Sequence, residues 1–258
     1  MRVASPSLRR EQWLVLSVLA VLAAGGWALV LWQAAAMDGS QAMRLDLTMG
    51  MAAPLFLVMW VAMMVGMMFP ASAAMILAFA RTQTGKRDTG APYAPTWLFV
   101  APYVAVWTAF GALGYGLAIG TDALASDSMW PMNNLSRIAG GLLIIAGVYQ
   151  LTPLKRVCLA RCRSPLAFML SYWRDGRWGA VSMGLRHGMF CLGCCWVLFL
   201  LLLPLGVMNI GAMLAVAALV FAEKALPRGD TTAKVAAGVL IAYGLLAIAV
   251  PDALPTAM

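Results

Sequence analysis

Seven apolar segments separated by short polar or charged stretches make up the hydropathy pattern of the chain. Each is close in length to a helix that crosses a bilayer, because roughly 20 residues rising about 1.5 Å each span a hydrocarbon core of about 30 Å. The pattern predicts an all-α polytopic transmembrane bundle of about seven spans, formed as a single integral membrane domain over residues 1–258. The predicted spans are residues 13–36, 55–80, 97–121, 137–153, 181–205, 207–223 and 233–250.

The fourth and sixth segments are short, so a bundle of six spans is the alternative. The fourth begins at Arg137, whose long stem can carry its charge out to the headgroups. The first follows Arg9 and Arg10 as a signal peptide would. Its apolar stretch is longer than the roughly 7–15 residues of a signal peptide, so we interpret it as a retained helix.

The composition narrows the class of protein further. Hydrophobic residues make up 63% of the 258 residues, charged residues 11%, and the mean hydropathy is +0.85. Soluble domains are about 45–50% apolar and about 25% charged. These figures exclude a soluble globular domain, a disordered chain and a secreted disulfide scaffold.

The positive charges predict the orientation, because cytoplasmic loops carry an excess of Lys and Arg. With the N-terminus in the cytoplasm and the C-terminus outside, 16 of the 18 basic residues fall inside, and only Arg44 and Arg137 fall outside. Basic residues then follow membrane topology and do not mark a nucleic-acid surface. Six of them lie in residues 153–179, a segment with several aromatic residues that we interpret as a cytoplasmic interfacial segment.

The candidate chemistry gathers in the fifth predicted span, where His187 is the only histidine of the chain. At about 100° per residue, three thiols (Cys191, Cys194 and Cys195) lie within about 80° of it on one side of a helix. Imidazole and sulfur bind a soft or borderline metal ion; we favour Cu(I), with Zn(II) as the alternative. Two helical turns separate His187 from Cys194. A single ion would therefore require local unwinding at Gly193, and otherwise two adjacent ions would share the set.

Cys158 and Cys162 stand among basic residues of the interfacial segment. Nearby cations favour the thiolate form, so this pair is a candidate entry or hand-off site for metal, with two unreacted thiols as the alternative. None of the five cysteines is predicted on the outer side, which argues against a disulfide framework.

The second predicted span is rich in methionine. Met63 and Met67 are one helical turn apart and Met68 flanks them. Since thioethers suit Cu(I), we interpret these three residues as a metal relay; adaptable core packing is the alternative.

The sixth predicted span ends in Glu223-Lys224. In an antiparallel hairpin with the fifth span, Glu223 is expected level with about residue 190. It could serve as a metal ligand, as a partner that orients His187, or as a proton acceptor. The alternative is an interfacial carboxylate paired with Arg186 or Lys224.

Several of these residues stand in motifs similar to those of an uncharacterised bacterial family of predicted metal-binding integral membrane proteins, a domain-of-unknown-function family. The resemblance implies metal binding and no settled activity. The family tends to have Met at the position of Phe199. The matching segments are Trp60-x-x-Met63-x-x-Gly66-Met67-Met68-x-Pro70, Tyr149 to Lys155 with Cys158 and Cys162-Arg163-Ser164-Pro165, His187-Gly188 with Cys191-x-Gly193-Cys194-Cys195-Trp196, Gly206 to Asn209, and Glu223-Lys224.

Together these observations predict a multi-pass protein of the bacterial cytoplasmic (inner) membrane. It would bind a soft metal, with copper favoured, and act in metal transport, hand-over or metal-centre assembly. Its expected partners are the bilayer and a metal donor or acceptor protein, with no nucleic acid; the oligomeric state is left open. Two alternatives are a thiol oxidoreductase coupling Cys191 and Cys194 to a quinone, and an assembly factor with a structural metal. A non-enzymatic role is favoured, and no catalytic residues are predicted.

Overall fold

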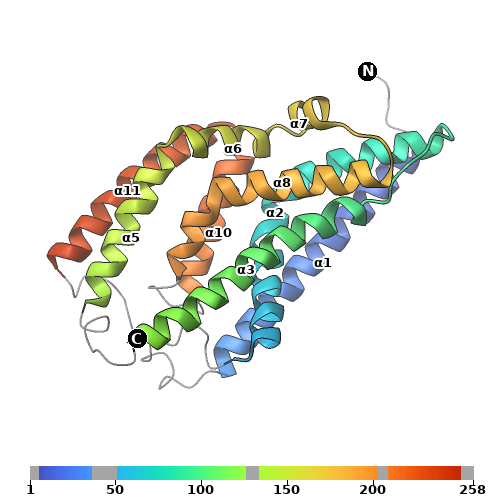
Figure 1. Ribbon diagram of the computed structural model, residues 1–258. Coiled ribbons are helices and arrows are strands. Elements are labelled where there is room, and N and C mark those ends of the chain that lie inside the picture. The colour runs from blue at the N-terminus through green and yellow to red at the C-terminus, as the bar shows by residue number, and fades with distance from the viewer. Residues whose placement is uncertain (1–5, 37–50, 126–133, 203–208, 251–258) are drawn as a thin grey trace.

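The computed structural model describes residues 6–36, 51–125, 134–202 and 209–250, and these residues form helices and connecting turns without a strand. This confirms the all-α prediction. Helices α1, α2 and α3 lie side by side on one flank, α5 and α11 form a pair on the other, and α8 and α10 lie between them (Figure 1). The helices are α1 (Pro6–Ala36), α2 (Ala53–Asp88), α3 (Trp97–Ala125), α5 (Leu135–Gln150), α6 (Pro153–Arg163), α7 (Pro165–Tyr172), α8 (Gly176–Leu200), α10 (Ile210–Ala225) and α11 (Gly229–Ala249).

Five helices in the described part of the chain are long and apolar enough to cross a membrane, namely α1, α2, α3, α8 and α11. A sixth span results if the bent pair of α5 and α6 counts as one. Helix α10, which covers the sixth predicted segment, has 16 residues. Its length of about 24 Å is shorter than a typical hydrocarbon core. Length and composition thus give five or six candidate spans among the described residues, and the predicted count of seven is not reached there.

The fourth predicted span ends earlier than the hydropathy pattern suggested. Helix α5 ends at Gln150, and the chain then bends by 66° into α6. Pro153 disfavours a helical conformation at the residue before it, and Thr152 is accordingly extended (φ −68°, ψ 149°). The Thr152 hydroxyl then caps α6 by accepting a hydrogen bond from the Lys155 backbone N–H at 3.3 Å. The bend directs α6 toward α8.

Helices α6 and α7 cover most of the segment predicted to be interfacial, and they lie along one end of the bundle (Figure 1). Leu154, Leu166 and Leu170 are exposed on them. The Arg161 guanidinium lies over the Tyr172 ring, 5.5 Å from its centroid. Exposed apolar side chains beside basic ones are typical of helices at headgroup level. The cytoplasmic position of this end stays a prediction.

An ion pair connects the C-terminal end of α2 to the start of α8. Lys86 donates to the Asp175 carboxylate, and its ammonium lies 4.9 Å from the centroid of the Trp173 ring. The hydrogen bond from Lys86 holds the pKa of Asp175 below its ordinary value. The segment that precedes α8 is thereby attached to α2.

Helices α5 and α11 pack closely because small residues face each other at their contact. A Cβ added to Gly140 would lie 2.8 Å from the carbonyl oxygen of Gly244, and one added to Gly147 would lie 2.9 Å from that of Ala237. Such residues allow two helix backbones to approach in a membrane. This pair forms one wall beside the central helices α8 and α10.

Candidate metal centre

Helix α8 supplies four of the residues that the sequence singled out, and all four are buried. His187, Cys191, Cys194 and Cys195 are each at most 1% exposed. The helix continues unbroken through Gly193 to Leu200. The helical period alone therefore places these side chains on one buried side, without local unwinding at Gly193.

Close contact between α3 and α8 brings Tyr103 to the first of these thiols. A Cβ on Gly184 would clash with the carbonyl oxygen of Phe99, so the α3 backbone lies where a side chain would otherwise be. The Tyr103 hydroxyl lies 3.3 Å from Cys191 Sγ and 3.0 Å from the Ser72 hydroxyl of α2. A continuous chain of polar contacts thus leads from α2 through α3 to Cys191.

Helix α6 adds a fourth thiol. Cys162 Sγ lies 4.0 Å from Cys194 Sγ. The thiols of Cys194 and Cys195 both donate to the Cys191 carbonyl oxygen, at 3.1 and 2.8 Å. We call Cys162, Cys191, Cys194 and Cys195 the thiol cluster. All four cysteines are free.

Cys158, the fifth cysteine, is also free and buried but contacts a different part of α8. A Cβ on Gly193 would lie 2.8 Å from Cys158 Sγ, so the absence of a side chain there lets α6 approach. The Tyr149 hydroxyl donates to the carbonyl oxygen of Gly193. Of the two cysteines of α6, Cys162 is the one that reaches another thiol in the described residues.

Lys224 is a site residue that the sequence reasoning missed. Its side chain is 8% exposed, and its ammonium lies 3.0 Å from Cys191 Sγ. Within the described residues no carboxylate forms an ion pair with it. A buried cation is costly unless an anion compensates it, so the thiol cluster is the region where negative charge is favoured. A lysine near the end of an apolar helix was the available signal, but its direction depends on how α10 packs.

Glu223, one residue earlier, points to a different partner. Its carboxylate accepts hydrogen bonds from Lys155 Nζ and Gln150 Nε2, both at 2.6 Å. All three side chains are at most 2% exposed. Among the residues that the structure describes, this carboxylate has no ion pair with Arg186 or Lys224, and it connects α10 to the two helices that flank the 66° bend. Adjacent residues of α10 thus carry one charge to the thiols and the other to Lys155.

His187 lies in an aromatic environment on α8. Its ring stacks with Phe99 and Tyr103, at centroid distances of 5.7 and 5.2 Å, and meets the edge of Phe168 at 5.8 Å. Within the described structure neither ring nitrogen has a hydrogen-bond partner. A buried polar atom without a partner costs roughly 1–3 kcal/mol. A bound ligand that pairs with a ring nitrogen would remove this cost, so the unpaired nitrogens of His187 are those expected at a ligand site.

The predicted methionine relay on α2 is buried, but its members point in different directions. Ser72 marks the side of α2 that leads to Tyr103 and Cys191. By helical period, Met68 lies within about 40° of Ser72, whereas Met63 and Met67 lie about 140–180° away. Two buried methionines that the prediction did not include share the Ser72 side, within about 80° of it: Met64 and Met75.

The spacing of the thiols limits what they can bind. In the described parts of the chain, no three His, Cys, Asp or Glu side chains are arranged to hold one ion together. A structural zinc site has four ligands in a tetrahedron, which this arrangement does not provide. Two sulfurs bound to one ion at about 2.3 Å each lie at most about 4.6 Å apart, so Cys162 and Cys194 at 4.0 Å can share one ion. The described residues form an all-helical protein whose longer helices are apolar enough to cross a membrane, and its site is a buried thiol pair suited to a soft, low-coordinate metal ion.

Comparison with known proteins agrees with a site for a soft metal ion. A family model described as "PpoB2: Copper chaperone" matches residues 57–247, which is more than half of the chain and includes the whole thiol cluster. The chain belongs to this copper chaperone family. The resemblance to a metal-binding family is therefore confirmed at the level of a metal-related family. Neither the curated proteins nor the solved structures gave a match to the chain.

Proposed function

We propose that this protein is a membrane-embedded chaperone that holds Cu(I) in the thiol cluster and passes it to a protein partner. The observation that carries the proposal is the 4.0 Å separation of Cys162 and Cys194, two buried thiols contributed by different helices. Thiolates bind Cu(I), Zn(II) and Fe–S clusters, and a pair of sulfurs supplies fewer ligands than the four of a structural zinc site, which favours Cu(I). Cys191 and Cys195 adjoin the pair, and Lys224 supplies a positive charge beside the sulfurs.

We place the protein in the bacterial inner membrane, with its N-terminus in the cytoplasm and its C-terminus outside. The distribution of Lys and Arg over the predicted loops supports this orientation. Helices α6 and α7 then lie at the cytoplasmic headgroups, and α6 itself contributes Cys162. A donor or acceptor protein would approach the thiol cluster from this side.

We assign the transfer of copper toward the thiol cluster to two groups outside it, His187 and Met68. His187 is one helical turn from Cys191, and both of its ring nitrogens lack partners in the described structure. Met68 lies on the side of α2 that leads to Tyr103, with Met64 and Met75 close to the same side. Met63 and Met67 we assign to packing, and Glu223 to holding Lys155 in place.

The decisive experiment is a Cu(I) competition titration against a chromophoric chelator, performed anaerobically on the full chain in detergent. Cys162→Ser and Cys194→Ser should each weaken copper binding by 100-fold or more, because loss of a ligand costs at least as much as the roughly 10–100-fold cost of losing an outer-shell partner. Cys158→Ser is the matched control, since it changes another buried thiol on α6. Its affinity should stay within about threefold of wild type. Wild-type affinity in both ligand variants, or no copper bound by the wild type, would refute the proposal.

The same pair of thiols supports a second candidate, a thiol oxidoreductase. Sulfurs 4.0 Å apart can close to a disulfide of about 2.05 Å with a small shift of α6 against α8. Oxidation would release two electrons and two protons, which a quinone can accept as it becomes a quinol. Counting free thiols by mass after adding a soluble quinone tests this candidate. Loss of two thiols in Cys158→Ser but not in Cys162→Ser would favour it over copper transfer.

A further inference from the structure

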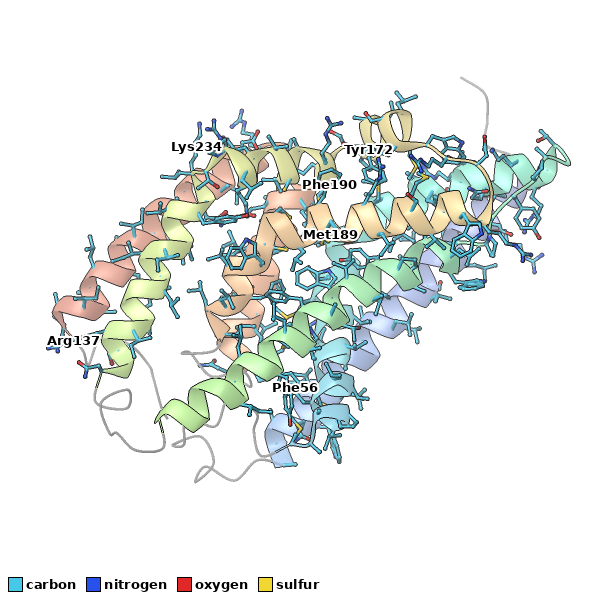
Figure 2. All side chains as sticks on the ribbon, viewed as in Figure 1. Phe56, Arg137, Tyr172, Met189, Phe190 and Lys234 are labelled. Atoms are coloured by element: carbon cyan, nitrogen blue, oxygen red, sulfur yellow. The ribbon has the colours of Figure 1, made fainter. Side chains whose placement is uncertain are left out.

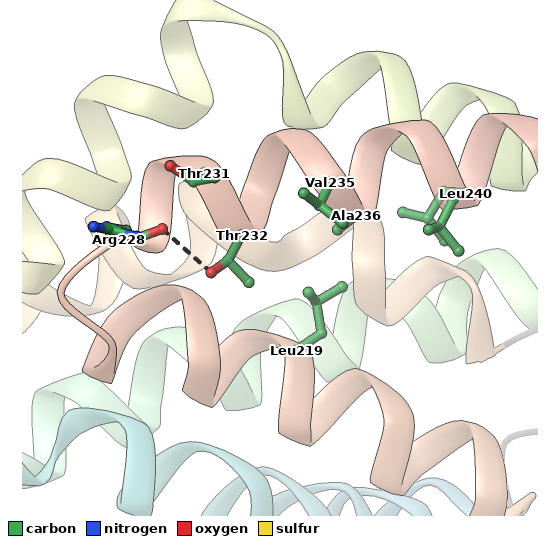
Figure 3. A pocket seen from close by; sticks show the side chains of 8 residues that line it. Leu219, Arg228, Thr231, Thr232, Val235, Ala236 and Leu240 are labelled. Atoms are coloured by element: carbon green, nitrogen blue, oxygen red, sulfur yellow. Dashed lines mark hydrogen bonds between the residues drawn. The ribbon is translucent and has the colours of Figure 1, made fainter.

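A groove between α10 and α11 lies outside the thiol cluster and has no role in the proposed function. Figure 3 shows side chains that line this groove, and its volume is about 440 Å³. The walls are apolar, with Leu219 on α10 facing Val235, Val239 and Leu240 on α11. Val235 and Val239 are each more than 60% exposed in the described structure. The groove therefore opens to the surroundings of the helix pair.

The chemistry of the groove changes at the end where α11 begins. There the lining residues are Arg228, Thr231 and Thr232 (Figure 3). The Thr232 hydroxyl donates to the backbone carbonyl of Arg228 at 3.2 Å, which fixes the backbone of the turn. Among the described residues, no hydrogen bond or ion pair engages the Arg228 guanidinium.

The surroundings of this end are basic and rigid. The Arg163 guanidinium donates to the carbonyl oxygens of Leu226 and Pro227, at 2.7 and 2.8 Å, and lies 3.7 Å from Asp230. Lys234 lies on α11 near the same end of the helix pair (Figure 2). This end therefore carries three cations and one carboxylate, so it attracts an anion. The cations are Arg163, Arg228 and Lys234, and the carboxylate is Asp230.

We propose that the groove binds one acidic phospholipid, with the phosphate at Arg228 and an acyl chain along Leu219, Val239 and Leu240. Helix α11 is one of the candidate membrane spans, so its first residues lie at headgroup level and its apolar part at the level of the acyl chains. Basic pockets between transmembrane helices bind acidic headgroups in this way. An amphiphile matches both halves of the groove, whereas a soluble anion would leave the apolar walls uncovered.

Native mass spectrometry of the delipidated full chain, titrated with phosphatidylglycerol or phosphatidylcholine, tests this inference. One phosphatidylglycerol should bind about five-fold more tightly than phosphatidylcholine, as expected for one interfacial arginine. Arg228→Gln should remove this preference. Arg137→Gln is the matched control, because Arg137 is exposed at the opposite end of the α5–α11 pair (Figure 2) and should leave the preference intact.

A second variant separates the groove from ordinary lipid around the protein. Val239→Trp fills the apolar part without changing charge and should abolish retention of the single lipid. Circular dichroism checks that each variant remains helical. The inference is wrong if the two lipids bind equally to the wild type, or if Arg228→Gln behaves like Arg137→Gln. A dimer that forms equally with and without lipid, and is lost in Val239→Trp, would assign the groove to a second copy of the chain instead.

Discussion

Replacing Lys224 by Met tests whether the buried ammonium stabilises a bound copper ion. Methionine preserves the length of the side chain and removes its charge. Two thiolates with one Cu(I) carry a net charge of −1, and the nearest buried positive charge is Lys224, whose ammonium lies 3.0 Å from the adjoining Cys191 Sγ. For charges roughly 5–8 Å apart at an effective dielectric constant of about 20, the attraction amounts to about 2–3 kcal/mol. We therefore expect Lys224→Met to weaken Cu(I) binding by at least about 30-fold.

The same charge argument predicts that Lys224→Met does not weaken the binding of zinc. Two thiolates with Zn(II) are neutral, so the ammonium contributes little attraction, and zinc affinity should be unchanged or higher in Lys224→Met. Chelator competition with each metal, at one pH and in one detergent, gives both affinities. Lys224→Arg should retain most of the copper affinity because it retains the charge.

The control is the double variant Lys155→Met/Glu223→Gln, which removes a buried ion pair that does not touch the thiols. Its copper affinity should stay within a few-fold of wild type. Equal losses for copper and zinc in Lys224→Met would show that the substitution disturbs packing and not charge. An unchanged copper affinity in a helical, folded Lys224→Met protein would refute the reasoning.

Two further predictions concern stability, measured by the unfolding of detergent-solubilised protein. Glu223→Gln should destabilise the protein by about 3–5 kcal/mol because it leaves Lys155 buried without a countercharge. Adding Lys155→Met should recover most of that loss. A Glu223→Gln protein as stable as wild type would contradict this prediction. Gly184→Ala should cost about 1–3 kcal/mol because the new methyl group meets the Phe99 carbonyl oxygen. Gly114→Ala, which meets nothing within 4 Å, should be neutral or slightly stabilising, and equal effects of the two substitutions would count against the packing argument.

Local periodicity was sufficient to predict the features that lie within one helix. The apolar segments predicted the helices. The rotation of about 100° per residue predicted that His187 and the α8 cysteines share one side of a helix. A period states which side of a helix is buried, but not which neighbour covers it. For this reason the sequence could not separate Met68, on the side that leads to Cys191, from Met63 on the far side of α2.

The features that join different helices were not predictable from local patterns. Cys162 reaches Cys194 because Pro153 ends the preceding helix and directs α6 across α8, whereas the hydropathy pattern continued the span through residue 153. Glu223 and Lys224 are adjacent, so a rotation of about 100° about the axis of α10 decides which one faces the thiols. That rotation depends on packing against α2, α6 and α11, which no single helix encodes.

Helix α10 carries Leu219 at the groove and Lys224 at the thiol cluster, five residues apart on one rigid rod. Because an α-helix scarcely compresses along its axis, a shift of α10 that accompanies filling of the groove displaces the ammonium relative to Cys191 by a similar amount. From the proposed copper and lipid sites together, we expect the affinity for the metal to depend on the composition of the bilayer as well as on the chain. The same protein reconstituted in two different lipid mixtures is accordingly expected to hold its cargo with two different strengths.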